Sequence, residues 1–197
     1  MKDKAYFNRY IEVFLKENSK LNLISKNDEK FLWEKHISDS LSIEKFFDKF
    51  GTDFKTMLDF GTGGGFPSVP VALAYPELEV TALDSIRKKI NAVEEIRTEL
   101  NILNLNTVCD RVENIKQTFD IVTSRAVASL DKIIDYAMPR LAGRGYFVAY
   151  KSRKAAQEID NAKAVLKKYS AEIVDIIEYN LPLEENHTRN LVIIRKK

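Results

Sequence analysis

Apolar residues recur every three or four positions through the first fifty residues, a spacing typical of amphipathic helices. A first helix is predicted from Tyr6 onward, with an apolar face made of Phe7, Tyr10, Ile11, Phe14 and Leu15. A second helix is predicted over residues 28–50, with Asp28 as its N-cap. Its apolar residues are Phe31, Leu32, Trp33, Ile37, Leu41, Phe46 and Phe47. Residues 1–50 are therefore expected to form an N-terminal helical extension.

From Gly51 onward, short runs typical of strands alternate with helical stretches. The predicted strands are residues 55–60, 79–83, 106–109, 119–123, 146–150, 171–179 and 191–195. The predicted helices are residues 69–74, 86–100, 130–141 and 155–169. This alternation predicts one compact α/β domain over residues 51–197, with a Rossmann-like, mostly parallel seven-stranded sheet. No helix separates the last two strands, so they should form an antiparallel hairpin across a loop that contains Pro182.

Composition excludes several classes of protein. The 197 residues are 45% hydrophobic, enough for a full core without disulfides or a structural metal. Cys109 is the single cysteine and only His36 and His187 could join it, so no metal site is expected. We expect neither a signal peptide nor a membrane span, and hence a cytoplasmic protein. The net charge of +2 does not by itself indicate nucleic acid.

Four glycines occupy residues 61–65, directly after a predicted strand and before a predicted helix. Such a loop lets the backbone approach a ligand closely. The alternative is a tight turn that needs positive φ angles, for which one or two glycines should suffice. Phe66 stands where the dinucleotide fingerprint requires Gly or Ala, and no Gly-Lys-Ser/Thr follows as a P-loop requires.

Two acidic residues flank this loop. Asp59 precedes it in the pattern Asp-Phe-Gly-x-Gly-x-Gly, which resembles the first motif of S-adenosylmethionine-dependent methyltransferases. That cofactor carries an ammonium and a sulfonium, so an acid at Asp59 is favourable by charge. Asp84 stands at the end of the second predicted strand, where an acid can accept hydrogen bonds from ribose hydroxyls. Asp84 could instead cap the following helix.

Five segments extend the resemblance to one family. They are HISDSL (36–41), DFGTGGGFPSVP (59–70), LDS (83–85) followed by two lysines (88–89), RVE (111–113) and SRA (124–126). Together they closely resemble the small-subunit ribosomal RNA guanine-N7 methyltransferase G family, also called glucose-inhibited division protein B. The resemblance runs from about residue 22 to the C-terminus. It implies S-adenosylmethionine as the cofactor, held by Gly61, Gly63, Phe66, Asp84, Val112, Glu113 and Arg125.

The sequence departs from the family pattern at three positions. Ser152 follows Lys151 and Ser68 follows the first proline of the loop segment, each where the family has glycine. Asn190 stands where a histidine is common. None of these replaces a cofactor contact that the resemblance implies.

The chemistry of guanine N7 fits the absence of an obvious general base. N7 carries an in-plane lone pair and no proton, so its methylation needs orientation and proximity alone. Arg125, which the resemblance implies lies beside the target base, is expected to orient guanine or a phosphate. Its alternative role is a salt bridge to a carboxylate such as Glu113. Enzymes of cytosine C5 or adenine N6 fit less well, because Cys109 lies outside a Pro-Cys motif and no Pro-Pro occurs.

Basic residues near the ends of the predicted strands could contact RNA phosphates. The candidates are Arg87, Lys88, Lys89, Arg140, Arg144, Lys151, Arg153 and Lys154. His36 and Trp33 could stack on a base, although an apolar helical face more often places such residues in the core.

The sequence therefore predicts a monomeric methyltransferase that acts on guanine N7 in the 530 loop of 16S ribosomal RNA within the small subunit. Three alternatives remain. The chain could methylate a small molecule or a protein, because a fold does not fix a substrate. It could be a ribosome-assembly factor without activity. It could be a nicotinamide dehydrogenase, against which Phe66 argues.

Overall fold

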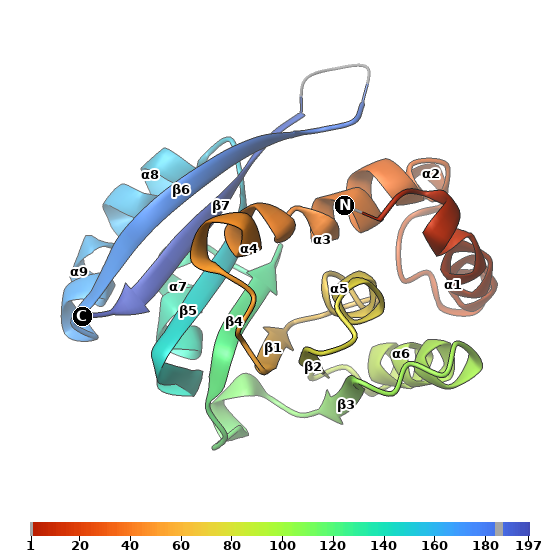
Figure 1. Cartoon of the computed structure of the whole chain (residues 1–197), viewed down its shortest axis with the longest axis horizontal. Helices are drawn as coiled ribbons and strands as arrows, with labels where there is room; N and C mark the ends of the chain where they lie inside the picture. Colours follow the sequence, from red (N-terminus) through yellow and green to blue (C-terminus); the bar gives the residue numbers. More distant parts are fainter. Residues whose placement is uncertain (1, 184–186) are drawn as a thin grey trace.

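A seven-stranded sheet forms the centre of the computed structural model, which describes residues 2–183 and 187–197 (Figure 1). In chain order its strands are β1 (Thr56–Phe60), β2 (Glu79–Asp84), β3 (Leu105–Cys109), β4 (Phe119–Arg125), β5 (Leu141–Ser152), β6 (Ala171–Leu181) and β7 (His187–Lys196). The order across the sheet is β3-β2-β1-β4-β5-β7-β6. Strands β1 to β5 are parallel, and β7 lies antiparallel between β5 and β6. The predicted strands and the C-terminal hairpin are confirmed.

Buried residues alternate between the two faces of the sheet, as successive side chains of a strand must. On one face, Met57 and Val80 belong to a cluster covered by α1 (Asn8–Leu21), α4 (Glu44–Phe50), α5 (Ser68–Ala74) and α6 (Arg87–Glu99). On the other, Leu58 and Leu83 belong to a cluster covered by α7 (Leu130–Ala137), α8 (Ala155–Asn161) and α9 (Lys163–Lys168). The result is the three-layered arrangement of an α/β protein.

The predicted helix over residues 155–169 is divided in the structure. Ala162 separates α8 from α9, and its N–H is shared between the carbonyls of Glu158 and Ile159. The helix predicted to reach residue 141 ends earlier, because a 3₁₀ turn, Met138–Arg140, leads directly into β5.

The N-terminal extension is helical but is not two long helices. After a 3₁₀ turn, Ala5–Phe7, and α1 come α2 (Lys26–Glu29), a π-helical segment (Leu32–Ile37), α3 (Ser38–Leu41) and α4. The prediction of one helix over residues 28–50 is therefore wrong, and so is Asp28 as its N-cap. Ser25 is the N-cap of α2, and its hydroxyl accepts a hydrogen bond from the backbone N–H of Asp28.

The extension packs against the glycine loop. The ring of Phe66 lies 5.0 Å from that of Phe14 and 6.4 Å from that of Tyr10, measured between centroids. Glu99 of α6 accepts from Arg9 and Lys16 of α1 at 3.0 and 2.8 Å, and the two helices lie side by side (Figure 1). Since these residues share one core with the sheet, the boundary between residues 50 and 51 stays a prediction.

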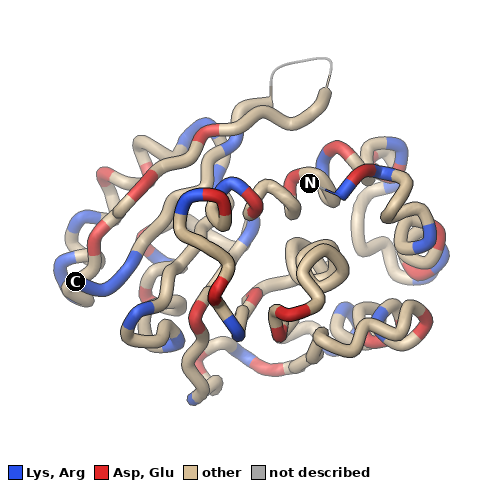
Figure 2. The backbone as a smooth tube through the Cα atoms, in the orientation of Figure 1, with Lys and Arg blue, Asp and Glu red and all other residues tan. Residues whose placement is uncertain are grey.

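Two features of the described residues bear on partners. No helix among them is long and apolar enough to cross a membrane. Residues 2–183 and 187–197 hold no group of three His, Cys, Asp or Glu side chains placed to bind a metal ion. Basic and acidic residues are interspersed along the chain (Figure 2), so an RNA surface depends on particular side chains.

Candidate active site

The glycine loop lies at the carboxyl end of β1, next to the point where the chain order across the sheet reverses between β1 and β4. Such switch points are the usual ligand sites of open α/β sheets. Gly61, Gly63 and Gly65 have φ angles of 71°, 60° and 90°. Three glycines thus meet the conformational need of the turn, more than the one or two expected. The number of glycines is therefore weak evidence for a ligand.

Gly63 differs from its neighbours in what surrounds it. A Cβ atom at Gly61 would lie 2.3 Å from Cγ2 of Val127, and one at Gly65 would lie 2.6 Å from Cγ2 of Val69. A Cβ at Gly63 would meet nothing within 4 Å. Gly63 therefore borders open space, and it is here that the loop can approach a ligand.

Asp84, at the end of β2, ties this loop to the next strand. One carboxylate oxygen accepts from the N–H of Gly63 at 3.0 Å, and the other accepts from the N–H of Ile86 at 2.9 Å. The second contact lies just before α6, so Asp84 also satisfies a backbone donor at the start of that helix. The contact with ribose stays a prediction.

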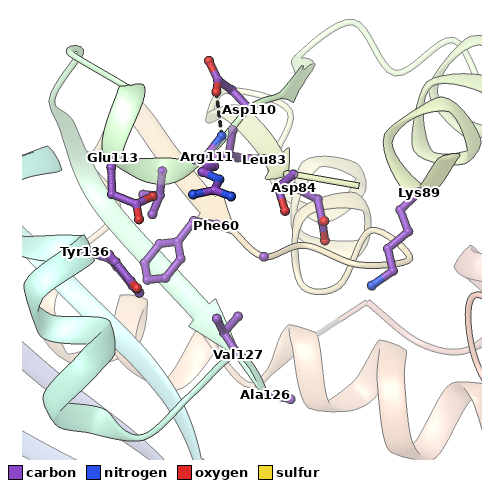
Figure 3. Close-up of a pocket in the computed structure, with 13 residues that line it drawn as sticks. Phe60, Leu83, Asp84, Lys89, Asp110, Arg111, Glu113, Ala126, Val127 and Tyr136 are labelled. Atoms are coloured by element: carbon purple, nitrogen blue, oxygen red, sulfur yellow. Dashed lines mark hydrogen bonds between the residues drawn. The ribbon is translucent and has the colours of Figure 1, made fainter. Parts of the chain in front are cut away.

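Beside Asp84 lies a cavity of about 500 Å³, which we call the first cavity. Its lining residues are Phe60, Gly61, Leu83, Asp84, Ser85, Lys89, Asp110, Arg111, Val112, Glu113, Ala126, Val127 and Tyr136. Figure 3 shows Asp84 and Lys89 on one side and Glu113 and Tyr136 on the other, with Phe60 between them. Four predicted cofactor residues meet here: Gly61, Asp84, Val112 and Glu113. Asp59, Gly63, Phe66 and Arg125 are not among the lining residues.

Sequence reasoning missed Tyr136 and Phe60 in this cavity. Phe60 is the last residue of the first predicted strand. The apolar pattern of that strand gave no sign that Phe60 faces a ligand site. Tyr136 comes from α7, which packs against β4 and β5 and brings the ring of Tyr136 to that of Phe60, and this placement is a tertiary feature.

Asp59 is wholly buried below the loop. Its carboxylate accepts from the N–H of Ser68 at 3.2 Å and from the hydroxyl of Thr123 at 3.3 Å. Burial raises the pKa of Asp59 to about 6, against the lowering effect of hydrogen bonds from Thr62 and Ser68 and of the charge of Arg125. Ser68, where the family has glycine, also bonds the hydroxyl of Thr62 at 2.6 Å, so this departure is built into the same network.

Changing Asp59 to Asn should alter how stability depends on pH. The pKa of Asp59 is about 6 in the folded chain and about 3.9 when unfolded. The folded chain therefore binds the proton more firmly, and the free energy of unfolding contributed by Asp59 falls as pH rises from about 4 to about 6. As pH rises across that window, the free energy of unfolding of Asp59→Asn should increase by about 2 to 3 kcal/mol relative to that of the wild type.

Urea unfolding of both proteins at several pH values between 4 and 7 measures this difference. Comparison with the wild type is essential, because burial and the charge of Arg125 lower the pKa of His36 to about 4. His36 thus makes the free energy of unfolding rise with pH over this range, opposite to the effect of Asp59. This contribution is the same in both proteins and cancels in the difference between them. The exposed Asp160→Asn is the control. Equal pH dependence of Asp59→Asn and the wild type would contradict the burial argument.

Arg125 ends β4 and lines a second cavity of about 680 Å³. Its Nη1 donates to a carboxylate oxygen of Asp39 at 2.9 Å and to the carbonyl of Lys35 at 3.2 Å. Its guanidinium carbon lies 5.2 Å from the ring centroid of Phe66. The alternative that sequence left open, a salt bridge, is thus present, but its partner is Asp39 and not Glu113.

His36 also lines the second cavity. Because a guanidinium can only donate, Nδ1 of His36 accepts from Arg125 at 3.2 Å, and Nε2 carries the proton. Nε2 is buried without a partner among the described residues. Trp33 packs on Phe7, with ring centroids 5.8 Å apart, as the core interpretation expects.

Two tyrosines hold the HISDSL segment from the other side. The hydroxyl of Tyr150 donates to the carbonyl of Ser40, and that of Tyr179 donates to the carboxylate of Asp39, both at 2.7 Å. Tyr179 comes from β6. Neither was predicted, because the strand register that brings them to residues 39 and 40 has no signal in the sequence.

A short wall, Ala126–Val127, lines both cavities, which therefore adjoin at these residues. Ala126 has a φ of 57°, a strained value for a residue with a side chain. Beyond the wall, Nζ of Lys151 contacts the carbonyl of Ala128 and the carboxylate of Glu158, both at 2.7 Å. Lys151 is only 7% exposed, and its ammonium group is paired with these two oxygen atoms inside the protein. This argues against Lys151 as an RNA contact.

The other basic candidates lie in different places. Lys89 lines the first cavity, and Arg87 and Lys88 are exposed beside it at the start of α6. Arg153 and Lys154 are exposed where β5 ends, at the same edge of the sheet. Arg144 is exposed near the start of β5, at the opposite edge, which argues against a contact near the cavities. Arg140 is buried and therefore does not face RNA.

The fold is shared with solved methyltransferases. One is a structure of TYW2 from M. jannaschii in complex with AdoMet, with a TM-score of 0.60, 15% identity, and 79% of this chain and 74% of that chain covered. Another is a ribosomal protein L11 methylase from Lactobacillus delbrueckii subsp. bulgaricus, with a TM-score of 0.59, 20% identity, and 81% and 77% covered. The fold is therefore the Rossmann-like fold that these methyltransferases have.

The sequence places the chain more narrowly. The family model for rRNA small subunit methyltransferase G matches residues 3–192, and the chain belongs to that family. A ribosomal RNA small subunit methyltransferase G from Thermoanaerobacter sp. (strain X514) is 36% identical over 197 residues, with 97% of this chain and 81% of that protein covered. The protein of that name from Bacillus subtilis (strain 168) is 33% identical over 196 residues, with 96% and 81% covered.

Proposed function

We propose that this protein transfers the methyl group of S-adenosylmethionine to N7 of a guanine in the 530 loop of 16S ribosomal RNA. Membership of the rRNA small subunit methyltransferase G family supports the cofactor and the RNA substrate. One structural observation carries the proposal further. Two cavities share Ala126 and Val127 as lining residues, and one lies beside the glycine loop and the other beside Arg125. A donor in one cavity and an acceptor in the other can thus meet where the cavities adjoin.

The first cavity fits the cofactor. A volume of about 500 Å³ is within the range for ligands of this size. Asp84 offers a carboxylate for ribose hydroxyls, Val112 offers an apolar side chain for adenine, and Gly63 leaves open space for the methionyl part. When bound, the cofactor supplies an electrophilic methyl group on a sulfonium.

The second cavity fits a nucleotide of RNA by charge. Lys35, Arg125 and Lys151 each pair with a carboxylate, at 2.8, 2.9 and 2.7 Å. Arg189 also lines this cavity and has no carboxylate partner among residues 2–183 and 187–197. As far as the described residues show, Arg189 is therefore a cation available to a phosphate. No residue need remove a proton from N7, and neutral His36 together with Arg125 orients the base.

The protein is proposed to act as a monomer. The substrate places the activity in the cytoplasm, where ribosomes are assembled.

The test is methyl transfer from labelled S-adenosylmethionine to small subunits that lack the modification and to stripped 16S RNA. Mass spectrometry then maps the modified nucleotide. A single N7-methylguanine in the 530 loop is the expected result. Binding of the cofactor without transfer to either RNA would overturn the RNA substrate. It would favour a small-molecule or protein acceptor, or an assembly factor without activity.

A further inference from the structure

Arg140 is a buried arginine whose only hydrogen bonds among the described residues go to backbone carbonyls. It ends the 3₁₀ turn before β5 and is 9% exposed. Its Nε donates to the carbonyl of Ile115 at 3.1 Å, and its Nη2 donates to the carbonyl of Glu113. The sequence suggested an RNA contact here, but the guanidinium points into the protein.

Stability alone does not account for a charge in this position. Burying a guanidinium costs free energy that a carboxylate partner would partly offset, and carbonyl dipoles offset less. No ion pair of Arg140 occurs within residues 2–183 and 187–197. An apolar side chain would fill the same volume without this cost. The arrangement therefore suggests a role in fixing geometry.

What Arg140 fixes is one wall of the first cavity. Its two acceptor carbonyls belong to the turn Val112–Asn114 and the residue that follows. Val112 and Glu113 line the cavity, and Figure 3 shows Glu113 across from Asp84.

The other hydrogen bonds of this turn are local. The N–H groups of Asn114 and Ile115 donate to carbonyls three residues earlier. The carboxylate of Asp110 accepts from the N–H of Arg111 and the amide of Asn114, each at 2.7 Å. Within the part of the chain described, Arg140 is thus the hydrogen-bonding connection between this turn and the sheet.

We propose that Arg140 is a positioning residue for the nucleobase of the methyl donor. By holding the carbonyls of Glu113 and Ile115, it sets the distance between the turn and Asp84, and so the width of the slot for adenine. This inference rests on the proposed placement of the cofactor in the first cavity. It predicts that Arg140 governs discrimination between purines although it does not touch the ligand.

The experiment compares binding of S-adenosylhomocysteine and S-inosylhomocysteine by calorimetry. The wild type should prefer the adenine compound. Arg140→Met should lower the affinity for S-adenosylhomocysteine on the order of tenfold, because two charged hydrogen bonds are lost. It should also remove most of the preference for adenine over hypoxanthine. Arg140→Lys can restore one of these hydrogen bonds, so its affinity and its preference should lie between those of the wild type and Arg140→Met. At saturating cofactor, kcat should stay within about twofold of the wild type.

Arg144→Met is the matched control, since it removes an exposed arginine from β5, the strand that follows the turn of Arg140. It should leave both affinities unchanged. If Arg140→Met does not fold, Arg140→Lys decides the question by the ratio of its affinities for S-adenosylhomocysteine and S-inosylhomocysteine. Unchanged purine preference in a folded variant would overturn the proposal, and lost RNA affinity with normal cofactor binding would make Arg140 an RNA residue. Failure of the wild type to bind S-adenosylhomocysteine would instead refute the proposed function.

Discussion

Replacement of Arg125 by alanine should lower kcat for methyl transfer about a hundredfold, because misplacing a reacting group by about 1 Å can cost that much. Arg125 holds Nδ1 of His36 and lies over the ring of Phe66, so its loss leaves the second cavity, the proposed acceptor site, without its orienting cation. KM for S-adenosylmethionine should change little, since Arg125 does not line the first cavity. Steady-state kinetics with both substrates varied measure the two constants.

The same substitution should also destabilise the fold. The carboxylate of Asp39 is buried, and Arg125 is its cationic partner. An unpaired buried carboxylate costs roughly 3 kcal/mol. Activity and stability can therefore fall together for different reasons, and alanine alone does not separate them.

The double variant Arg125→Ala with Asp39→Asn separates them. It removes both charges, so most of the lost stability should return, while kcat should stay low. Recovery of kcat along with stability would show that Arg125 acts only by holding Asp39. Normal transfer by Arg125→Ala would show that the second cavity is not the acceptor site.

The parallel sheet was predictable from sequence because its signals are local. Short, mainly apolar runs that are separated by helical stretches, as at residues 55–60 and 79–83, reflect burial on both faces of a strand. The position of β7 between β5 and β6 was not predictable in the same way. Register depends on pairings far apart in the sequence, and one hairpin can add to a sheet edge in either order.

The extension shows a different kind of failure. Its apolar spacing suggested one helix over residues 28–50, yet the chain forms a π-helical segment at Leu32–Ile37. This segment places His36 and Asp39 against Arg125. Such irregular turns are frequent at functional sites, where tertiary contacts override local preference.

The candidate site was predictable in part. Gly61, Asp84, Val112 and Glu113 follow from motif positions at strand ends, since carboxyl ends of parallel strands meet at one edge. The partner of Arg125 was not predictable, because Asp39 lies 86 residues earlier in the sequence and no periodicity links the two residues. The burial of Arg140 and Lys151 was not predictable for a related reason, since the sequence alone does not show whether a basic residue near a strand end is buried.

Replacement of Gly63 by arginine should abolish binding of S-adenosylmethionine by filling the space beside the glycine loop. The backbone there has a φ of 60°, and a Cβ at this residue would have no atom within 4 Å beyond its chain neighbours. The folded chain can therefore accept the side chain at the cost of backbone strain, about 1 to 2 kcal/mol. Gly63→Ala should carry the same strain with a smaller loss of affinity. Calorimetry with S-adenosylmethionine and thermal unfolding measure the two effects.

Gly51→Ala is the control for strain. Gly51 has a φ of 85° with a ψ of 178°, and it too has nothing within 4 Å of a Cβ position. That conformation is almost restricted to glycine, so this variant should lose at least as much stability as Gly63→Ala. It should nevertheless bind the cofactor normally, because residue 51 lies before β1 and away from the first cavity. If Gly63→Arg binds the cofactor as the wild type does, the methionyl part does not pass Gly63, and the proposed orientation in the first cavity must be reversed.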